Sequence, residues 1–140
     1  MKNHVISKLM MLSLLIVAGI GVAQAQVTER LKADIPFSFH VGNKELPAGE
    51  YLIQVKDPLT GVMEISSVNG KAAAMSTTYI AQMTLAPAHG ELVFDRYGDT
   101  YFLEKVFEQG DRNGDELIQS KLEKKLEKER DALEAVVFVE

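Results

Sequence analysis

The sequence contains no cysteine among its 140 residues. A chain without thiols forms no disulfide, carries no lipid on a cysteine and performs no thiol chemistry. It also lacks a phosphate-binding glycine loop, a dinucleotide-binding fingerprint, internal repeats and long low-complexity tracts. These absences argue against thiol chemistry, nucleotide-phosphate binding, dinucleotide binding and repeat architectures. They leave a chain that is stabilised by its hydrophobic core rather than by covalent links.

Basic residues are also few. The 15 Lys and Arg are outnumbered by 20 Asp and Glu, which gives a formal net charge of −5. Removal of Lys2 and Lys8 with the leader described below would change it from −5 to −7. An acidic domain without a basic stripe does not attract nucleic acid or anionic lipid. The sequence therefore predicts no nucleic-acid partner.

The N-terminus has the pattern of a secretory signal peptide. Lys2 and Lys8 give a positively charged region before an uncharged apolar run of 14 residues at 9–22. Ala23-Gln24-Ala25 then supplies the small residues of a cleavage site. The run is shorter than the roughly 20 residues of a membrane-spanning helix. We therefore expect a signal peptide at 1–25 and a single domain of 115 residues at 26–140. The mature chain is expected to be periplasmic or secreted and to have no transmembrane segment.

The remaining chain consists of short alternating segments between turn residues, which is typical of antiparallel β proteins. In the segment 35–41, alternate apolar residues share one face: Ile35, Phe37, Phe39 and Val41. His40 then lies on the opposite face. Pro36 cannot donate a ladder hydrogen bond, which places it at a sheet edge or a strand start.

Two hairpins are predicted from their turns. Asn69-Gly70 favours a type I′ turn that pairs 62–68 with 71–77, with an Ala- and Met-rich helix over 71–76 as the alternative. Gly98-Asp99 suits a two-residue type II′ turn. That register sets Tyr97 opposite Thr100 and Phe94 opposite Leu103.

The second hairpin is apolar on both faces, which predicts a pair of strands near the middle of the sheet with a cover on its outer side. On strict alternation the first face carries Leu92, Phe94, Tyr101, Leu103 and Phe107. The second face carries Val93, Tyr97, Phe102 and Val106 together with Asp95 and Glu104.

The C-terminal segment supplies the expected cover. Ser120 and Glu123 fit a capping box, and Leu122, Leu126 and Leu133 follow at helical spacing, so a surface helix is predicted over about 120–134. The final residues, AVVFVE, form either a last strand or an apolar tail. The predicted fold is thus mainly β, an antiparallel sandwich or partly open barrel of about six or seven strands with one C-terminal helix.

A possible recognition site lies at the tip of the second hairpin, which concentrates charged and aromatic residues: Asp95, Arg96, Tyr97, Asp99 and Tyr101. Ordinary turn chemistry also accounts for them, with Arg96 stacked on Tyr101 across the two strands.

The remaining polar motifs indicate no metal, cofactor or catalytic site. Asp111, Asn113 and Asp115 match the first three ligands of a calcium loop, but the required Gly and the final Glu are missing. The three residues instead suit a polar connection between the hairpin and the helix. His40 and His89 have neither metal-ligand spacing nor a nucleophile motif beside them.

Two segments resemble a group of small exported bacterial proteins of unknown function. The motifs are PFSFHVGNKELPAGEY at 36–51 and RYGDTYFL at 96–103, and the resemblance covers nearly the whole chain after residue 25. It implies an envelope or secreted location and a β-rich fold. It carries over no catalytic or binding residue.

The sequence favours the first of three functions, with the other two as alternatives. The first is a non-enzymatic envelope module that binds a protein or a surface polymer. The second is a carrier of a small apolar ligand, suggested by the apolar faces of 91–107 and by Met63, Met75 and Met83, which are adaptable pocket liners as well as ordinary core residues. The third is an enzyme, which would require His40 or His89 to lie beside Asp95 or Asp99.

Overall fold

The computed structural model describes residues 30–139, and the predicted signal peptide lies outside this range. The described residues form ten strands and one helix: β1 (Arg30–Ile35), β2 (Phe39–Val41), β3 (Lys44–Leu46), β4 (Gly49–Asp57), β5 (Val62–Ser67), β6 (Ala73–Gln82), β7 (Glu91–Tyr97), β8 (Thr100–Phe107), β9 (Asn113–Leu117), α2 (Lys121–Glu129) and β10 (Leu133–Phe138). The predicted fold class, mainly antiparallel β with one C-terminal helix, is confirmed, and the sheet does not close on itself.

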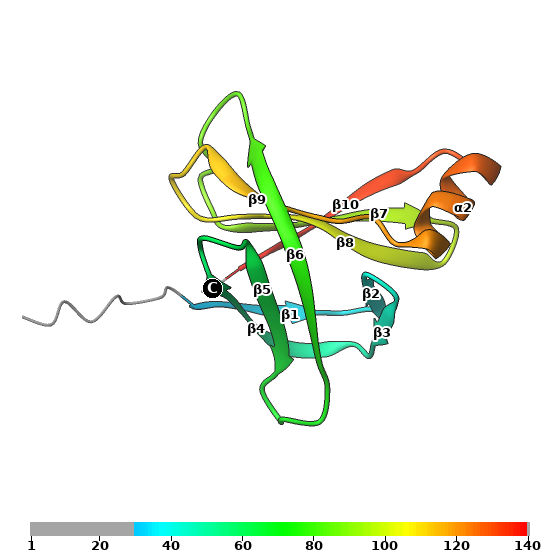
Figure 1. The fold of residues 1–140 in the computed structure, drawn as a ribbon, viewed down its shortest axis with the longest axis horizontal. Helices are drawn as coiled ribbons and strands as arrows, with labels where there is room; N and C mark the ends of the chain where they lie inside the picture. The colour runs from blue at the N-terminus through cyan, green and yellow to red at the C-terminus, as the bar shows by residue number, and fades with distance from the viewer. Residues whose placement is uncertain (1–29, 140) are drawn as a thin grey trace, which may run out of the picture.

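Strand β6 links two layers (Figure 1). Its first half pairs with β5, which continues through β4 to β1, and these four form the first layer. Its second half pairs with β9, which continues through β8 and β7 to β10, and these form the second layer. The short β2–β3 hairpin lies beside β8 through the one parallel pair found in the described range, His40 with Phe102.

The expected strand at 35–41 is divided in two. β1 ends at Ile35 and β2 begins at Phe39, with Pro36 in the break between them. This agrees with the inability of proline to continue a hydrogen-bonded ladder. The predicted alternation still holds, because Ile35, Phe39 and Val41 are buried in the core and Phe37 packs against it.

The β5–β6 hairpin keeps the predicted register but not the predicted turn. Ser66 pairs with Ala73, and Ser67 and Ala72 close a longer loop. Asn69 does not have the positive φ that a type I′ turn requires. Its side-chain Oδ1 instead accepts hydrogen bonds from the backbone N–H of Lys71 and the hydroxyl of Ser67. The asparagine stabilises the loop through its side chain.

A β-bulge changes which residues of β8 face the core, so the predicted faces are partly wrong. Val93 pairs with Lys105 and Phe94 pairs with Leu103, so Glu104 is the extra residue. Beyond the bulge the alternation shifts by one, as bulges require. Val106 therefore joins the inter-layer core, whereas Phe107 lies on the outer face, the reverse of the sequence prediction.

The segment expected to be a polar connection before the helix contains strand β9. It pairs with β6 on one side and β8 on the other, so it lies inside the second layer. Its sequence, NGDEL, has low intrinsic β propensity. Pairing with both neighbours stabilises the strand where local preference does not.

Helix α2 is shorter than predicted and buries a different face. Ser120 is the N-cap, and its hydroxyl accepts a hydrogen bond from the Glu123 backbone N–H at 3.1 Å, as the capping box predicted. The helix ends at Glu129, and Leu133 belongs to β10. The buried residue of the helix is Glu123, whereas Leu122 is exposed.

The sequence left open whether AVVFVE forms a last strand or an apolar tail. Residues 135–138 of this segment belong to strand β10, which pairs antiparallel with β7. Ala135 and Val137 pack against the core, whereas Val136 and Phe138 are exposed. No second neighbour pairs with β10 within residues 30–139, so it forms an edge of the second layer.

Aromatic rings fill the core between the layers. Phe94 is fully buried and meets Phe37 edge to face at 5.1 Å and Phe39 at 5.6 Å between ring centroids. Phe37 also stacks on Tyr101 at 3.9 Å. Such pairs add stability beyond the area that they bury. Phe94 thereby connects β7 to the segment around β2.

We expect Phe94→Ala to lower the free energy of unfolding by about 3–5 kcal/mol, because it leaves a cavity between the layers. The matched change Phe138→Ala removes a ring that is 60% exposed and should cost less than about 1 kcal/mol. Guanidinium unfolding of both variants measures the two costs. Equal losses would contradict this description of the core.

Candidate functional site

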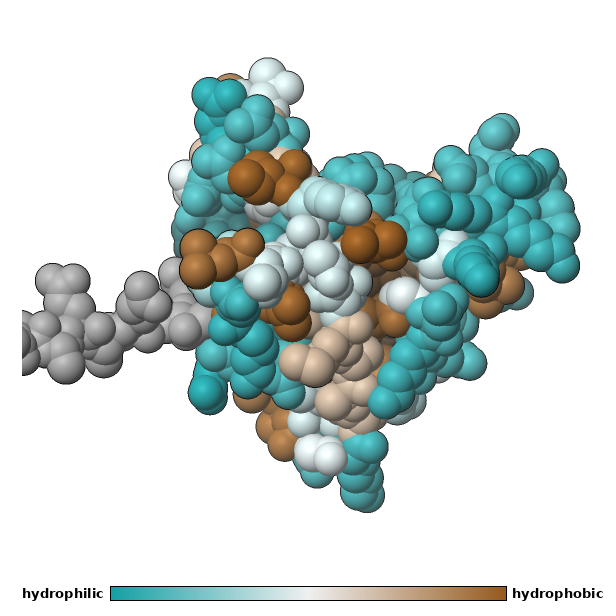
Figure 2. All heavy atoms as spheres, in the orientation of Figure 1, coloured by the Kyte–Doolittle hydropathy of each residue, from teal (hydrophilic) through white to brown (hydrophobic). Residues whose placement is uncertain are grey.

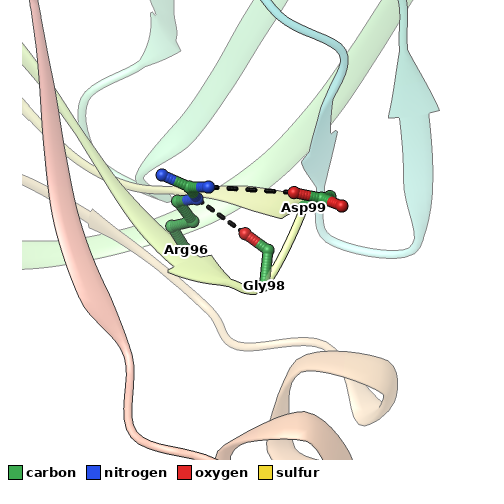
Figure 3. Close-up of polar contacts among 3 residues, drawn as sticks. All are labelled: Arg96, Gly98 and Asp99. Atoms are coloured by element: carbon green, nitrogen blue, oxygen red, sulfur yellow. Dashed lines mark hydrogen bonds and ion pairs between the residues drawn. The ribbon is translucent and has the colours of Figure 1, made fainter.

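Between the bulge and its tip, the β7–β8 hairpin has the predicted register and turn. Tyr97 pairs with Thr100, and Gly98 has a φ of +66° while Asp99 does not have a positive φ, which is the type II′ pattern. The Arg96 Nε donates to the Gly98 carbonyl at 2.6 Å, and Arg96 Nη2 lies 3.7 Å from Asp99 Oδ1 (Figure 3). The guanidinium also lies 5.4 Å from the centre of the Tyr101 ring, as expected from cross-strand stacking.

The five residues proposed as a recognition tip do not form one surface. Arg96 and Tyr101 lie on one face of the hairpin, where Tyr101 stacks on Phe37. Tyr97 is only 3% exposed and meets Phe102 edge to face. Asp95 is half-buried, and Asp99 alone is fully open to solvent at the turn. The contacts that these residues make serve mainly to hold the hairpin together.

An acidic cluster lies on the outer side of the second layer under helix α2. It comprises Asp95 from β7, Glu104 from β8 and Glu123 from α2. Glu104 lies beside Asp95, and its Oε1 accepts a hydrogen bond from Lys105 Nζ at 2.7 Å. Glu123 is 4% exposed, and its Oε1 has no hydrogen-bond partner within the described residues.

Burial is the main cause of raised pKa values in this cluster. It raises the pKa of Glu123 to about 7, with further contributions from Asp95, Glu104 and Glu127 and an opposing one from the Ser120 backbone N–H. Burial also raises the pKa of Asp95 to about 6, and the neighbouring Glu104 adds to that effect while Lys105 opposes it. Helix α2 therefore packs on the sheet most favourably when Glu123 and Asp95 are protonated.

In the described residues neither His40 nor His89 forms a hydrogen bond or ion pair with Asp95 or Asp99. His40 stacks on Phe102 at 4.8 Å, and its Nδ1 is buried without a hydrogen-bond partner in the described part of the chain. His89 meets Phe138 edge to face at 5.8 Å. Both rings thus make aromatic contacts that account for their positions.

Asp111, Asn113 and Asp115 form hydrogen bonds within the protein. Asp111 Oδ1 accepts from the Asn113 backbone N–H at 2.8 Å, and Asp115 Oδ1 accepts from the Thr78 hydroxyl at 2.7 Å. Within residues 30–139 no group of three or more His, Cys, Asp or Glu side chains is arranged to hold a metal ion.

A cleft of about 490 Å³ opens between the two layers, and we call it the inter-layer cleft. Its apolar wall comes from both layers: Leu31, Ile53, Val55 and Met63 from the first, and Ile80 and Val106 from the second. Its polar side consists of Gln82, Glu108, Asp111, Asn113, Gly114 and Asp115. Volumes of about 300–1,000 Å³ with a mainly apolar lining are typical of small-molecule sites.

Thr78 holds one end of this cleft in place. Its backbone N–H donates to the Gly61 carbonyl at 2.7 Å, and its hydroxyl bonds to both Gly61 and Asp115. Ile80, two residues further along β6, is 81% exposed although it is a large apolar residue. On the side seen in Figure 2, brown apolar patches lie among hydrophilic atoms over the region of β5 and β6.

Part of the lining of this cleft is predicted from the sequence. Met63 was proposed as a pocket liner and does line the cleft, whereas Met75 is exposed and Met83 packs on the outer face of the second layer. Ile80 and Val106 were missed. The bulge at Glu104 decides the direction of Val106, and nothing local in the sequence marks it.

Comparisons of the chain with protein-family models, with curated protein sequences and with solved structures found no match. In the described range, the structure has no helix with the length and apolar character needed to cross a membrane.

The acidic cluster makes stability depend on pH. The folded-state pKa of Glu123, about 7, lies above its ordinary value of 4.5, so the folded protein takes up a proton that the unfolded chain releases. This stabilisation is full below pH 4.5 and is lost as the pH rises through about 7. Glu123→Gln keeps a capping-box side chain. We expect its free energy of unfolding, relative to that of the wild type, to be about 1–3 kcal/mol higher at pH 8 than at pH 4.5.

Urea unfolding at several pH values measures this difference. Glu129→Gln, an exposed change on the same helix that is not among the groups acting on Glu123, should follow the wild-type curve much more closely. If Glu123→Gln and the wild type show the same change in stability from pH 4.5 to pH 8, Glu123 does not titrate as described.

Proposed function

We propose that this protein binds a small molecule with an apolar body in the inter-layer cleft. The observation that carries the proposal is a cleft of about 490 Å³ lined by apolar residues of both layers, one of which, Ile80, is 81% exposed. An apolar surface left open to water is unfavourable unless a ligand or partner covers it. A ligand in contact with Leu31, Val55 and Ile80, which are half-buried or exposed, would remove this surface from water.

The arrangement of the wall supports binding rather than turnover. Its side chains come from strands of both layers, and the contacts of Thr78 hold these strands together. Within residues 30–139 the lining of the cleft contains no histidine or serine.

The signal-peptide pattern at 1–25 predicts that the protein binds its ligand in the periplasm or outside the cell. A periplasmic or secreted binder meets ligands that have crossed the envelope or come from outside the cell. We therefore infer a carrier or a scavenger, and not a cytoplasmic enzyme.

A second candidate function is the recognition of an envelope protein or a surface polymer. It is favoured by β10, an edge strand with three exposed apolar side chains, Leu133, Val136 and Phe138. Unpaired edge strands add a further strand from a partner in many complexes.

Val136→Lys should abolish saturable retention of an envelope component, and retention that is unchanged would remove this candidate.

Binding in the cleft is tested with a neutral naphthylamine dye that fluoresces in apolar surroundings. We expect saturable binding by the wild type. The change Ile80→Asp should weaken it about tenfold or more, because a carboxylate replaces an apolar wall contact. Ile80 is 81% exposed, so the fold should tolerate the substitution.

The matched control is Tyr79→Asp. Tyr79 is the neighbouring residue of β6, is 65% exposed and points to the opposite face of the strand. It should leave dye binding unchanged. If the two variants bind the dye equally well, or if the wild type does not bind it, the cleft is not the ligand site.

A further inference from the structure

Helix α2 lies beside the turn end of the β7–β8 hairpin and has little apolar surface with which to hold on to it (Figure 1). Leu126 is half-buried, Leu122 is 41% exposed, and the other seven of its nine residues are charged. Just after the helix, Arg130 lies against the turn, since a β-carbon on Gly98 would be 2.5 Å from its Nη1. A helix of nine residues is not stable in water by itself. Its stability therefore depends on the one residue that it buries, Glu123.

The helix covers an aromatic pair of the second layer. Tyr97 and Phe102 are both buried, and their rings meet edge to face at 5.9 Å between centroids. Burial raises the pKa of Tyr97 to about 12, and the carboxylates of Asp95, Glu123 and Glu127 add to that effect. Two of these three acids belong to α2, so the Tyr97 hydroxyl lies beneath the helix.

The surroundings of Glu123 are acidic. Its Oε1 is buried and has no hydrogen-bond partner in the described part of the chain. The titratable and charged groups on the elements around it are Asp95 and Tyr97 of β7, Glu104 and Lys105 of β8, Glu127 of α2 and Arg130 after it, Glu134 of β10 and His40 of β2. Lys105 bonds to Glu104, and Arg130 lies at the Gly98 turn. Within residues 30–139 the Glu123 Oε1 is thus left without a compensating base.

Ionisation of Glu123 opposes the packing of the helix on the sheet. A carboxylate that is buried without a partner loses its hydration and gains little in return, and neighbouring carboxylates repel it. Burial accordingly raises the pKa of Glu123 from 4.5 to about 7, and Asp95, Glu104 and Glu127 add to that effect. The packed helix is therefore fully stabilised below pH 4.5, and this stabilisation is lost as the pH rises through about 7.

The strands on either side of the helix are held independently of it. β9 pairs with β6 and β8, and β10 pairs with β7. Only the helix and the short connections at 118–120 and 130–132 lie between these two strands. A segment with few buried apolar contacts can unfold locally while the paired strands stay in place.

We propose that helix α2 is a lid that opens locally when the Glu123 carboxyl group ionises, and that its opening exposes the Tyr97–Phe102 pair while the two layers stay folded. The lid is closed in acidic surroundings and opens as the pH rises through neutrality. This inference does not depend on ligand binding in the inter-layer cleft, which lies on the inner side of the second layer.

Hydrogen exchange followed by mass spectrometry tests the lid, with exchange times scaled for the intrinsic effect of pH on amide exchange. Between pH 5 and pH 8 we expect the protection factors of residues 124–130 to fall by about 10- to 100-fold. At pH 8 they should be at least about tenfold lower than the protection factors of β4 and β5, because the helix opens without the sheet.

Glu123→Gln assigns the pH dependence to one carboxyl group. Glutamine keeps the size and the capping-box role of the side chain but does not ionise. Most of the fall in α2 protection between pH 5 and pH 8 should therefore disappear in this variant. The matched control is Glu129→Gln, an exposed change on the same helix that is not among the groups acting on Glu123, and it should behave as the wild type does.

A second measurement follows the exposure of Tyr97 at a single pH. At pH 8, tetranitromethane should nitrate Tyr97 several times faster in the wild type than in Glu123→Gln, because an open helix uncovers the ring. Tyr79 of β6, which is 65% exposed, is the internal reference and should react at the same rate in both proteins.

Four results would overturn the lid. The first is α2 protection that does not change between pH 5 and pH 8, and the second is a fall of the same size in Glu123→Gln. The third is equal protection of α2, β4 and β5 at pH 8, because the helix then opens only when the whole fold does. The fourth is equal nitration of Tyr97 in the wild type and in Glu123→Gln, because the helix then does not uncover the ring.

Discussion

The change of partner along β6 is the constraint on which the rest of the structure depends. Residues 73–77 pair with β5 and residues 78–82 pair with β9, so one strand belongs to both layers. At the crossing point the hydroxyl of Thr78 bonds to Gly61 in the first layer and to Asp115 in the second. A β-carbon on Gly61 would lie 2.7 Å from the Thr78 carbonyl oxygen, so the two backbones approach closely. This contact fixes the separation of the layers beside the inter-layer cleft.

The two sides of the second layer have different chemistry because β8 contains a bulge. On the inner side, Val106 and Leu103 continue the core toward the cleft. On the outer side, Glu104 and Lys105 lie next to Asp95 beneath helix α2. Because of the extra residue, the strand places an apolar side chain on the wall of the cleft and a carboxyl group beneath the helix. A change in the bulge would affect both sites together, since it alters the direction of every following residue of the strand.

Much of the fold was predictable because its signals are local. Alternation in 35–41, the Gly98-Asp99 turn, the Ser120 cap and the register of 62–66 against 73–77 depend on residues close together in the chain, and the structure confirms each of them. The errors arose where distant segments compete with local preference. NGDEL becomes a strand because β6 and β8 pair with it, and Glu123 is buried because the helix rests on the sheet. Propensity and periodicity do not contain that information.

The sequence by itself determined the β-rich class, the hairpin registers, the start of the helix and the absence of thiol chemistry, since composition and short-range spacing are sufficient for these. Tertiary structure alone decided that Leu31, Met63, Ile80 and Val106 share one cleft. Those residues are far apart in the chain and lie on four different strands. They meet because β6 joins the two layers and because the bulge turns Val106 inward, and both depend on pairing between strands that no local pattern specifies.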